Sequence, residues 1–219
     1  MDILVIVKRI LTSEDSPTHK LMDIADKTAV DMAINIRDRH GQGKGSVSVI
    51  CIAPIESSEI IRECYSLGVD TGYLLADPLF ESLTLDQLIM LLYHGIKKVD
   101  SYDVVIMPST SNDTVLVDIA GKLADMLNLK HIKNIDSFDG AGPTRLSLKG
   151  KKINDREIVE PPLMISFSCD AEQKIHNAMR IMKAYKKEVR VITSSEISKN
   201  DLNMDFDKVH HTHKKKIHK

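Results

Sequence analysis

The 219-residue sequence contains no tryptophan, and aromatic residues make up only 4% of it. Because proteins that bind single-stranded nucleic acids stack the bases on aromatic side chains, a base-stacking surface is not expected. Basic and acidic residues nearly balance, with a net charge of −1. Nucleic acids and anionic membranes are bound by strongly basic surfaces, so the composition favours neither as a partner.

Cysteine is also scarce. Cys51, Cys64 and Cys169 are the three cysteines, and no two of them form a CxxC pair. We therefore expect reduced, buried thiols in place of disulfides or a metal centre. Histidines gather only near the end of the chain, around His210 and His213. Nothing rigid is expected there to hold metal ligands, so we predict no metal site.

Long apolar runs are absent as well. A membrane-spanning helix needs roughly 20 consecutive apolar residues, and no run approaches this length. The opening Met-Asp-Ile-Leu-Val-Ile-Val-Lys-Arg has a short apolar part with its positive charges after it, unlike a secretory signal. We expect a cytoplasmic protein that does not insert into membranes.

Short apolar runs rich in β-branched residues alternate with segments of helical periodicity. The runs are typical of strands buried on both faces, and they lie at residues 3–7, 47–53, 73–76 and 104–107. The helical segments lie at residues 25–36, 60–67, 85–96 and 114–127. This alternation predicts an α/β fold of the Rossmann-like, adenine-nucleotide α-hydrolase-like type: a mostly parallel sheet with helices on both faces.

After residue 129 the pattern changes. Three short alternating segments, separated by glycines, predict an antiparallel hairpin excursion; they lie at residues 131–138, 144–148 and 157–159. The apolar run at residues 163–167 is predicted to return to the main sheet. We expect one domain over residues 1–192 and a polar C-terminal arm or disordered tail over residues 193–219.

The stretch from Tyr102 to Leu127 reads as a strand, a hydroxyl-rich loop and an amphipathic helix. In an open α/β sheet, anionic ligands bind where a strand leads into a helix N-terminus. Ser109, Asp113 and Thr114 suit either a phosphate or simple capping of the helix. Composition leaves these two interpretations open.

Motifs of known catalytic machinery are absent. The sequence contains no GxSxG, no Walker lysine loop and no HExxH. The glycines between Gly41 and Gly45 precede a strand, whereas a dinucleotide fingerprint follows one. We predict no catalytic residue and no enzymatic activity.

Four stretches together resemble the β subunit of electron-transfer flavoproteins. The opening strand ends in Val7-Lys8, and the helix entry from Met22 to Ala33 resembles that family's Met-Asn-Pro helix. The helix ending in Leu-Gly-Val-Asp resembles its Met-Gly-Ala-Asp. The Ile-Met-Lys-Ala that starts at Ile181 is close to its Ile-Met-Lys-Ala-Lys-Lys signature.

The resemblance implies a Rossmann-like core that pairs with a larger α subunit. In that family the heterodimer carries FAD, held mainly by the α subunit, and the β subunit binds AMP, or a second FAD in bifurcating members. The complex accepts electrons from dehydrogenases and passes them on without processing a substrate itself. The segment from Glu172 to Arg180 corresponds to the loop that docks on partner dehydrogenases.

The resemblance also implies a nucleotide pocket, with loop backbone groups on the phosphate and two isoleucines flanking the adenine. The residues expected to line it are Ile6, Asp23, Asp26, Ile52, Ser109, Asp113, Thr114 and Val117. Leu116 replaces a family glutamine and Asp118 a family glycine. The added negative charge of Asp118 opposes phosphate binding unless it points away.

Two alternatives share this core. One is a nucleotide-binding, universal-stress-like homodimer that binds ATP or nothing and carries no flavin. The other is a scaffold paralogue that keeps the α-subunit interface but has lost its nucleotide. Both predict the same fold, so the ligand and the partner distinguish them.

Overall fold

The computed structural model describes residues 1–7, 22, 24–40, 45–80, 83–108, 114–141, 144–150, 153–167 and 182–197. Its centre is a nine-stranded sheet with the order β7-β6-β5-β8-β4-β1-β2-β3-β9. The strands are β1 (Ile3–Val7), β2 (Val47–Ile52), β3 (Thr71–Leu75), β4 (Val104–Pro108), β5 (Lys130–Ala141), β6 (Leu146–Gly150), β7 (Ile153–Val159), β8 (Leu163–Phe167) and β9 (Val189–Ile192). From β5 to β9 along this order neighbouring strands pair in parallel, and β5-β6-β7 pair antiparallel.

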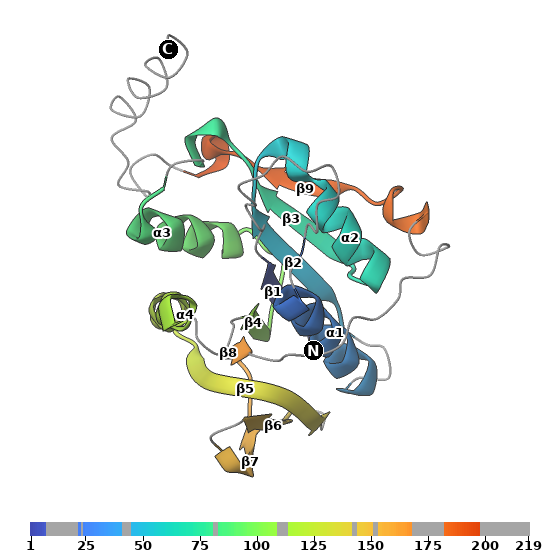
Figure 1. Ribbon diagram of the computed structural model, residues 1–219, viewed down its shortest axis with the longest axis vertical. Helices are drawn as coiled ribbons and strands as arrows, with labels where there is room; N and C mark the ends of the chain where they lie inside the picture. Colours follow the sequence, from blue (N-terminus) through green and yellow to red (C-terminus); the bar gives the residue numbers. More distant parts are fainter. Residues whose placement is uncertain are drawn as a thin grey trace.

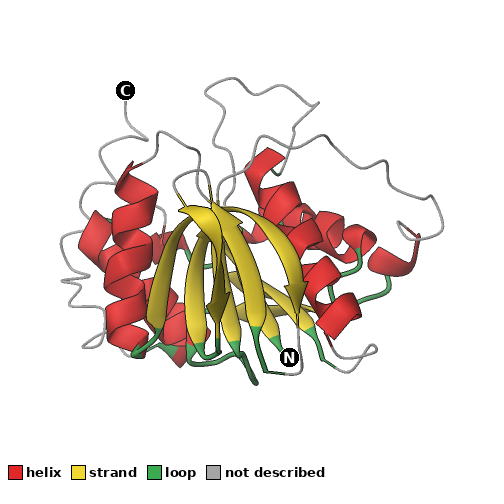
Figure 2. Cartoon of the chain, turned by 90° about the horizontal axis from the view of Figure 1, so that it is seen from below, coloured by secondary structure: helices red, strands yellow, loops and turns green. Residues whose placement is uncertain are grey.

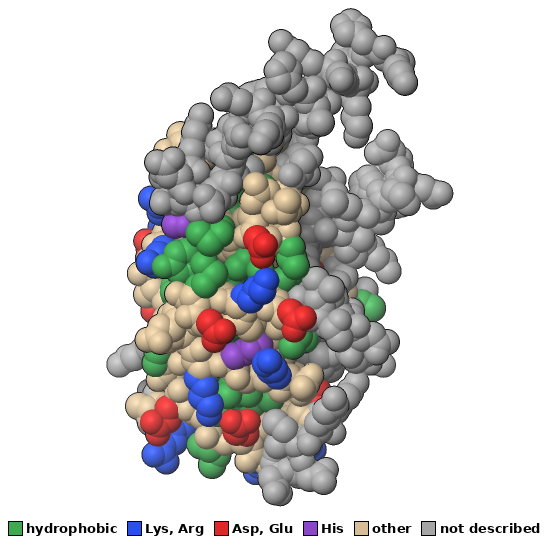
Figure 3. Space-filling view, turned by 90° about the vertical axis from the view of Figure 1, so that its left-hand side faces the viewer, with side chains coloured by type: hydrophobic (Ala, Val, Ile, Leu, Met, Phe, Trp, Pro, Cys, Tyr) green, Lys and Arg blue, Asp and Glu red, His purple; other side chains and the backbone are tan. Residues whose placement is uncertain are grey.

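Helices cover both faces of the sheet (Figures 1 and 2). They are α1 (Ile24–His40), α2 (Glu59–Leu67), α3 (Leu85–Ile96) and α4 (Thr114–Leu127), with short 3-10 turns η1 (Ile55–Ser57), η2 (Pro78–Phe80) and η3 (Ser194–Glu196). α1 and α2 pack on one face, whereas α3 and α4 pack on the other, on the side shown in Figure 3. No helix in the described part of the chain is long and apolar enough to cross a membrane. The predicted α/β fold is confirmed.

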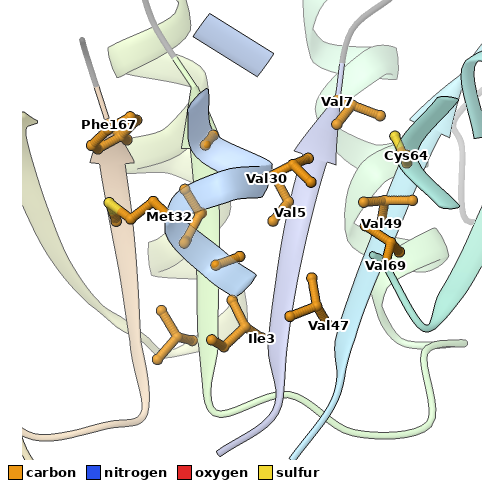
Figure 4. Packing of buried hydrophobic residues seen from close by; sticks show 14 of the residues in the cluster. Ile3, Val5, Val7, Val30, Met32, Val47, Val49, Cys64, Val69 and Phe167 are labelled. Atoms are coloured by element: carbon orange, nitrogen blue, oxygen red, sulfur yellow. The ribbon is translucent and has the colours of Figure 1, made fainter. Parts of the chain in front are cut away.

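Each face has its own hydrophobic cluster. Under α1 and α2, side chains such as Val30 and Met32 meet Val5 and Phe167 of the sheet (Figure 4). Under α3 and α4, Leu91 and Leu123 meet residues of β1, β2, β4 and β8. Burial on both faces explains why the core strands read as continuous apolar runs.

Local signals fix the helix ends. Thr84 accepts a hydrogen bond from the Gln87 N–H, and the Gln87 side chain accepts one from the Thr84 N–H, which is a capping box at the start of α3. α2 ends at Gly68, whose φ of 121° lies in the region that favours glycine. Both features can be read from the sequence, as Thr-x-x-Gln before an apolar stretch and as a glycine directly after one.

The hairpin region differs from the prediction in one respect. The antiparallel excursion is confirmed in β6 and β7, but β5 also belongs to the main sheet, since its first residues pair in parallel with β8. The register shifts between Ile132 and Ile135, where Asn134 has a φ of 59°. A bulge at this point lets one 12-residue strand take part in both pairings.

The C-terminal part of the described chain was only partly predicted. β9 was not expected, and it extends the sheet beyond β3. η3 follows it, and Ile197 is buried against the α3–α4 face. The polar sequence of residues 171–184 is compatible with a helix; of these residues only 182–184 lie within the described part, and they are helical. Residues 198–219 lie outside the described part, and the domain boundary at residue 192 stays a prediction.

Close packing of α2 on β3 depends on Gly72. A Cβ atom built there would overlap Cγ2 of Ile61 and lie 3.0 Å from the Tyr65 hydroxyl. The Gly72 N–H also donates to that hydroxyl, at 2.8 Å. We predict that Gly72→Ala lowers the free energy of unfolding by about 1–3 kcal/mol through overpacking, as measured by urea denaturation.

Gly140→Ala is the matched control, because a Cβ built at Gly140 meets no atom within 4 Å. Equal unfolding free energies for the two variants would contradict the packing argument.

Candidate functional site

The strand order reverses beside β1. From β1 the chain adds β2 and β3 on one side, and α3 then leads back to β4 on the other side. Ligands of open α/β sheets bind at the carboxyl ends of the strands where such a reversal occurs. Here those ends are Val7 of β1 and Pro108 of β4. This edge of the sheet is the candidate site.

Two helices begin at this edge, one on each face. α1 starts at Ile24 and has 17 residues, and α4 starts at Thr114 and has 14. The first N–H groups of a helix have no partner within the helix, and its dipole places partial positive charge there. The edge is therefore suited to an anionic group such as a phosphate.

Three predicted residues share the α3–α4 face. Ile6 is the penultimate residue of β1 and only 2% exposed, and Ile52 ends β2 and is half-buried. Ile6 belongs to the cluster beneath α3 and α4, and Ile52 packs against that cluster. Val117, half-buried, lies in the first turns of α4. The structure thus brings an apolar set from three elements to the expected edge.

Asp26 lies on the opposite face. It is in the first turn of α1 and is fully buried. Its charge adds to the rise in the pKa of Cys64, a neighbour on α2. A ligand would have to cross the end of the sheet to contact both Asp26 and Ile52.

The remaining predicted residues are not placed. Asp23, Ser109 and Asp113 lie outside the described residues, as does the segment from Glu172 to Arg180. Thr114 is placed only as the first residue of α4. Asp118, where the family has glycine, is exposed on α4. The roles of these residues stay predictions.

A group of sulfur atoms beneath the edge was not anticipated. The Cys64 thiol lies 3.4 Å from the thioether of Met22. Burial raises the pKa of Cys64, and the nearby Cys51 raises it further. The prediction of free, buried cysteines is confirmed for Cys51 and Cys64. A protonated thiol without exposure is a packing group and not a nucleophile.

A second unanticipated pair joins β5 to β8. Nε2 of His131 lies 2.7 Å from the hydroxyl of Ser166, which is 1% exposed. Nδ1 of His131 is buried, without a hydrogen-bond partner in the described residues. Burial lowers the pKa of His131, Lys133 lowers it further, and Asp125 opposes them. Ser166 is the only polar residue of β8 (Leu-Met-Ile-Ser-Phe). A single polar residue in an apolar strand was the one feature of the sequence that could have indicated this pair.

Comparisons with a family model and with known proteins agree with one another. A family model described as "Electron transfer flavoprotein domain" matches residues 12–197. The chain is 26% identical to "Electron transfer flavoprotein subunit beta" of Thermoanaerobacterium thermosaccharolyticum, covering 93% of this chain and 84% of that protein. It is 24% identical to the protein of the same name from Clostridium acetobutylicum, covering 90% and 75%.

A third relative is named as part of a larger complex. "Caffeyl-CoA reductase-Etf complex subunit CarD" of Acetobacterium woodii is 25% identical over 78% of this chain and 66% of its own length.

The His131–Ser166 pair predicts an acid-dependent loss of stability. The folded-state pKa of His131 lies below its ordinary value of 6.5. The unfolded chain therefore takes up the proton first, and the free energy of unfolding falls as the pH drops below about 6.5 towards the folded-state pKa. We expect His131→Gln to reduce this decline, measured by urea denaturation at pH 7.5, 6.5 and 5.5.

Other histidines contribute equally to both proteins, so the difference between the two pH profiles isolates His131. Parallel profiles over this pH range would refute the assignment.

Proposed function

The chain belongs to the electron transfer flavoprotein family, and on that premise we propose that it is the β subunit of such a flavoprotein, paired with a flavin-binding α subunit. The heterodimer takes electrons from dehydrogenases and passes them to a downstream acceptor. FAD, when bound, supplies the group that accepts and releases the electrons, and the α subunit holds it for the most part. This chain contributes no catalytic residue of its own.

The observation that supports the proposal is the location of the residues assigned to the nucleotide. The residues that the family resemblance assigns to a nucleotide include Ile6, Ile52 and Val117, and all three lie near the carboxyl edge where the strand order reverses. Half-buried Ile52 and Val117 offer apolar surface for an adenine, and the N-terminus of α4 offers N–H groups for a phosphate. These groups fit an adenine nucleotide.

The other assigned residues complete the proposed pocket. Ser109, Asp113 and Thr114 would contact the phosphate from the loop before α4. Asp23 and Asp26 would approach from the start of α1. These residues would hold AMP, or a second FAD, at the end of the sheet, and a bound nucleotide would stabilise the folded state.

The α3 side of the molecule is the proposed contact with the α subunit. Leu85 is 44% exposed, and Leu83, Leu88 and Tyr93 are only partly buried there. Figure 3 shows hydrophobic side chains gathered on this side at the height of α3. Gathered exposed apolar side chains are typical of a surface that a partner covers.

Co-expression with the α subunit tests the proposal. We expect a yellow heterodimer from which denaturation releases FAD and AMP, identified by absorbance and mass spectrometry. Release of FAD without AMP or a second FAD would support the scaffold alternative for this subunit. A chain that forms no complex with the α subunit, or a complex without flavin, would overturn the proposal.

The position of the phosphate generates a separate prediction. Asp118→Asn removes a negative charge from the N-terminal half of α4, where Asp118 is exposed. We expect AMP to bind about threefold more tightly to the nucleotide-stripped heterodimer, measured by titration calorimetry, because a solvent-exposed charge acts across a high dielectric.

Asp125→Asn is the control, since Asp125 is exposed near the other end of the same helix. If both variants bind AMP alike, the phosphate does not lie at the N-terminus of α4.

A further inference from the structure

The last described residue, Ile197, is buried on the α3 side of the sheet. It is 3% exposed and belongs to the cluster under α3 and α4. The turn before it, η3, is held to the residues that lead into α3, because the hydroxyl and the N–H of Ser194 both donate to the Asp77 carboxylate, at 2.6 Å and 3.1 Å. In Figure 1, η3 lies beside η2. The residues that follow Ile197 therefore start close to the beginning of α3.

Partly exposed leucines surround the beginning of α3. Leu85, the first residue of the helix, is 44% exposed, and Leu83 and Leu88 are half-buried. Leu83 and Leu88 pack against the same cluster that contains Ile197. We call Leu83, Leu85 and Leu88 the α3 surface. The capping box at Thr84 holds this turn of the chain in place, so the α3 surface is formed before any partner covers it.

Three apolar residues alternate with polar ones shortly after Ile197. Residues 201–207 read Asp-Leu-Asn-Met-Asp-Phe-Asp, so that single polar residues separate Leu202, Met204 and Phe206. In an extended chain successive side chains point to opposite sides, which places the three apolar side chains together on one side. This pattern is suited to an extended segment that lies on an apolar surface and turns its polar side to water.

We propose that residues 202–206 cover the α3 surface in the free chain, and that the α subunit displaces them when the heterodimer forms. Leu202, Met204 and Phe206 pack on the three leucines of the α3 surface. The displacement rests on the proposed function, in which this side of the molecule contacts the α subunit, whereas the covering does not. The chain thus carries its own competitor for the partner's binding surface.

The short connection favours this segment over a second copy of the chain as the occupant. Leu202 follows Ile197 by five residues and Phe206 follows it by nine, which span up to about 17 Å and about 30 Å when extended. The 12 residues of α3 are only about 18 Å long, so the segment is long enough to cover the α3 surface. A tethered segment meets its surface at an effective concentration of about 1 mM, whereas a second copy is limited by the protein concentration.

The absence of tryptophan allows a direct test of the covering. Phe206→Trp places a single tryptophan in the full chain, which is studied without the α subunit. We expect its emission to be blue-shifted from that of the urea-unfolded chain and protected from acrylamide, because the ring is buried on the α3 surface. Adding Leu85→Asp should shift the emission to the red and at least double the acrylamide quenching constant, since it puts a charge into the apolar contact.

Ile158→Asp is the matched control for Leu85→Asp. Ile158 is 67% exposed on β7, at the opposite end of the sheet from β9, so this change should leave the emission of the Phe206→Trp variant unaltered. Circular dichroism checks that both double variants are folded. Equal emission in the two double variants, or an unfolded-like emission in Phe206→Trp itself, would refute the covering. A blue shift that grows with protein concentration would assign the surface to self-association and refute it as well.

The displacement is tested with the purified α subunit. We expect Leu202→Ser/Met204→Ser/Phe206→Ser to bind it about tenfold more tightly than the wild-type chain in titration calorimetry, because a surface that is covered for most of the time is available to a partner for only a fraction of it. The control Asp201→Asn/Asp205→Asn changes the other side of the same segment and should bind within twofold of wild type.

The direction of the change in affinity decides the outcome. Equal binding by the triple variant would show that nothing has to be displaced, and weaker binding would assign residues 202–206 to the subunit interface. Either result overturns the displacement and leaves the proposed function intact. If the wild-type chain binds no α subunit, the proposed function fails together with the displacement, whereas the tryptophan emission still decides the covering.

Discussion

The fold depends on the complete burial of β1. Every residue of this strand is at most 2% exposed, and its backbone is paired on both sides, with β2 and with β4. Ile3, Val5 and Val7 belong to the cluster under α1 and α2, whereas Leu4 and Ile6 belong to the cluster under α3 and α4. Five apolar residues therefore contribute to both hydrophobic cores at once. Because successive side chains of a strand point to opposite faces, a polar residue at any of these positions would lie in one core or the other.

The candidate site is a consequence of the same strand. Since β2 and β4 both pair with β1, the connections that follow β1 and β4 leave the sheet at adjacent points. The helices after these connections, α1 and α4, begin on opposite faces of one edge. This arrangement brings together the partial positive charge of two helix N-termini and the apolar surface of Ile52. No single sequence motif is needed to produce it. A site of this kind tolerates much sequence change, because backbone groups and position provide most of its chemistry.

The sequence predicted what short-range patterns determine and missed what tertiary contacts determine. The core strands and the capping box at Thr84 were predictable because burial on both faces and helix capping leave local signals.

β9 was missed because it has four residues, of which Arg190 and Val191 are exposed, so no apolar run or clear alternation marks it. The double pairing of β5 was missed because a bulge cannot be read from hydrophobicity. The contact of His131 with Ser166 joins residues 35 positions apart on two strands, and no spacing rule relates them. Of the eight predicted pocket residues, the structure places the apolar ones near the expected edge, since apolar residues at strand ends follow from the strand pattern itself.

Most tyrosines of this chain, which has few aromatic residues, lie in one region of the structure. Three of the five tyrosines, Tyr65, Tyr73 and Tyr185, contact cations where the C-terminal segment meets α2 and β3. Arg190 of β9 lies over the Tyr73 ring and forms an ion pair with Asp100 at 2.7 Å, and Asp77 accepts two hydrogen bonds from Ser194. This part of the chain is thus attached by the pairing of β9 with β3 and by the buried Ala184, Ile192 and Ile197, and the polar and cation–π contacts add to these. Such contacts each stabilise the fold less than a buried apolar side chain does. Substitutions at these surface contacts should therefore cost less stability than substitutions in the two cores on β1.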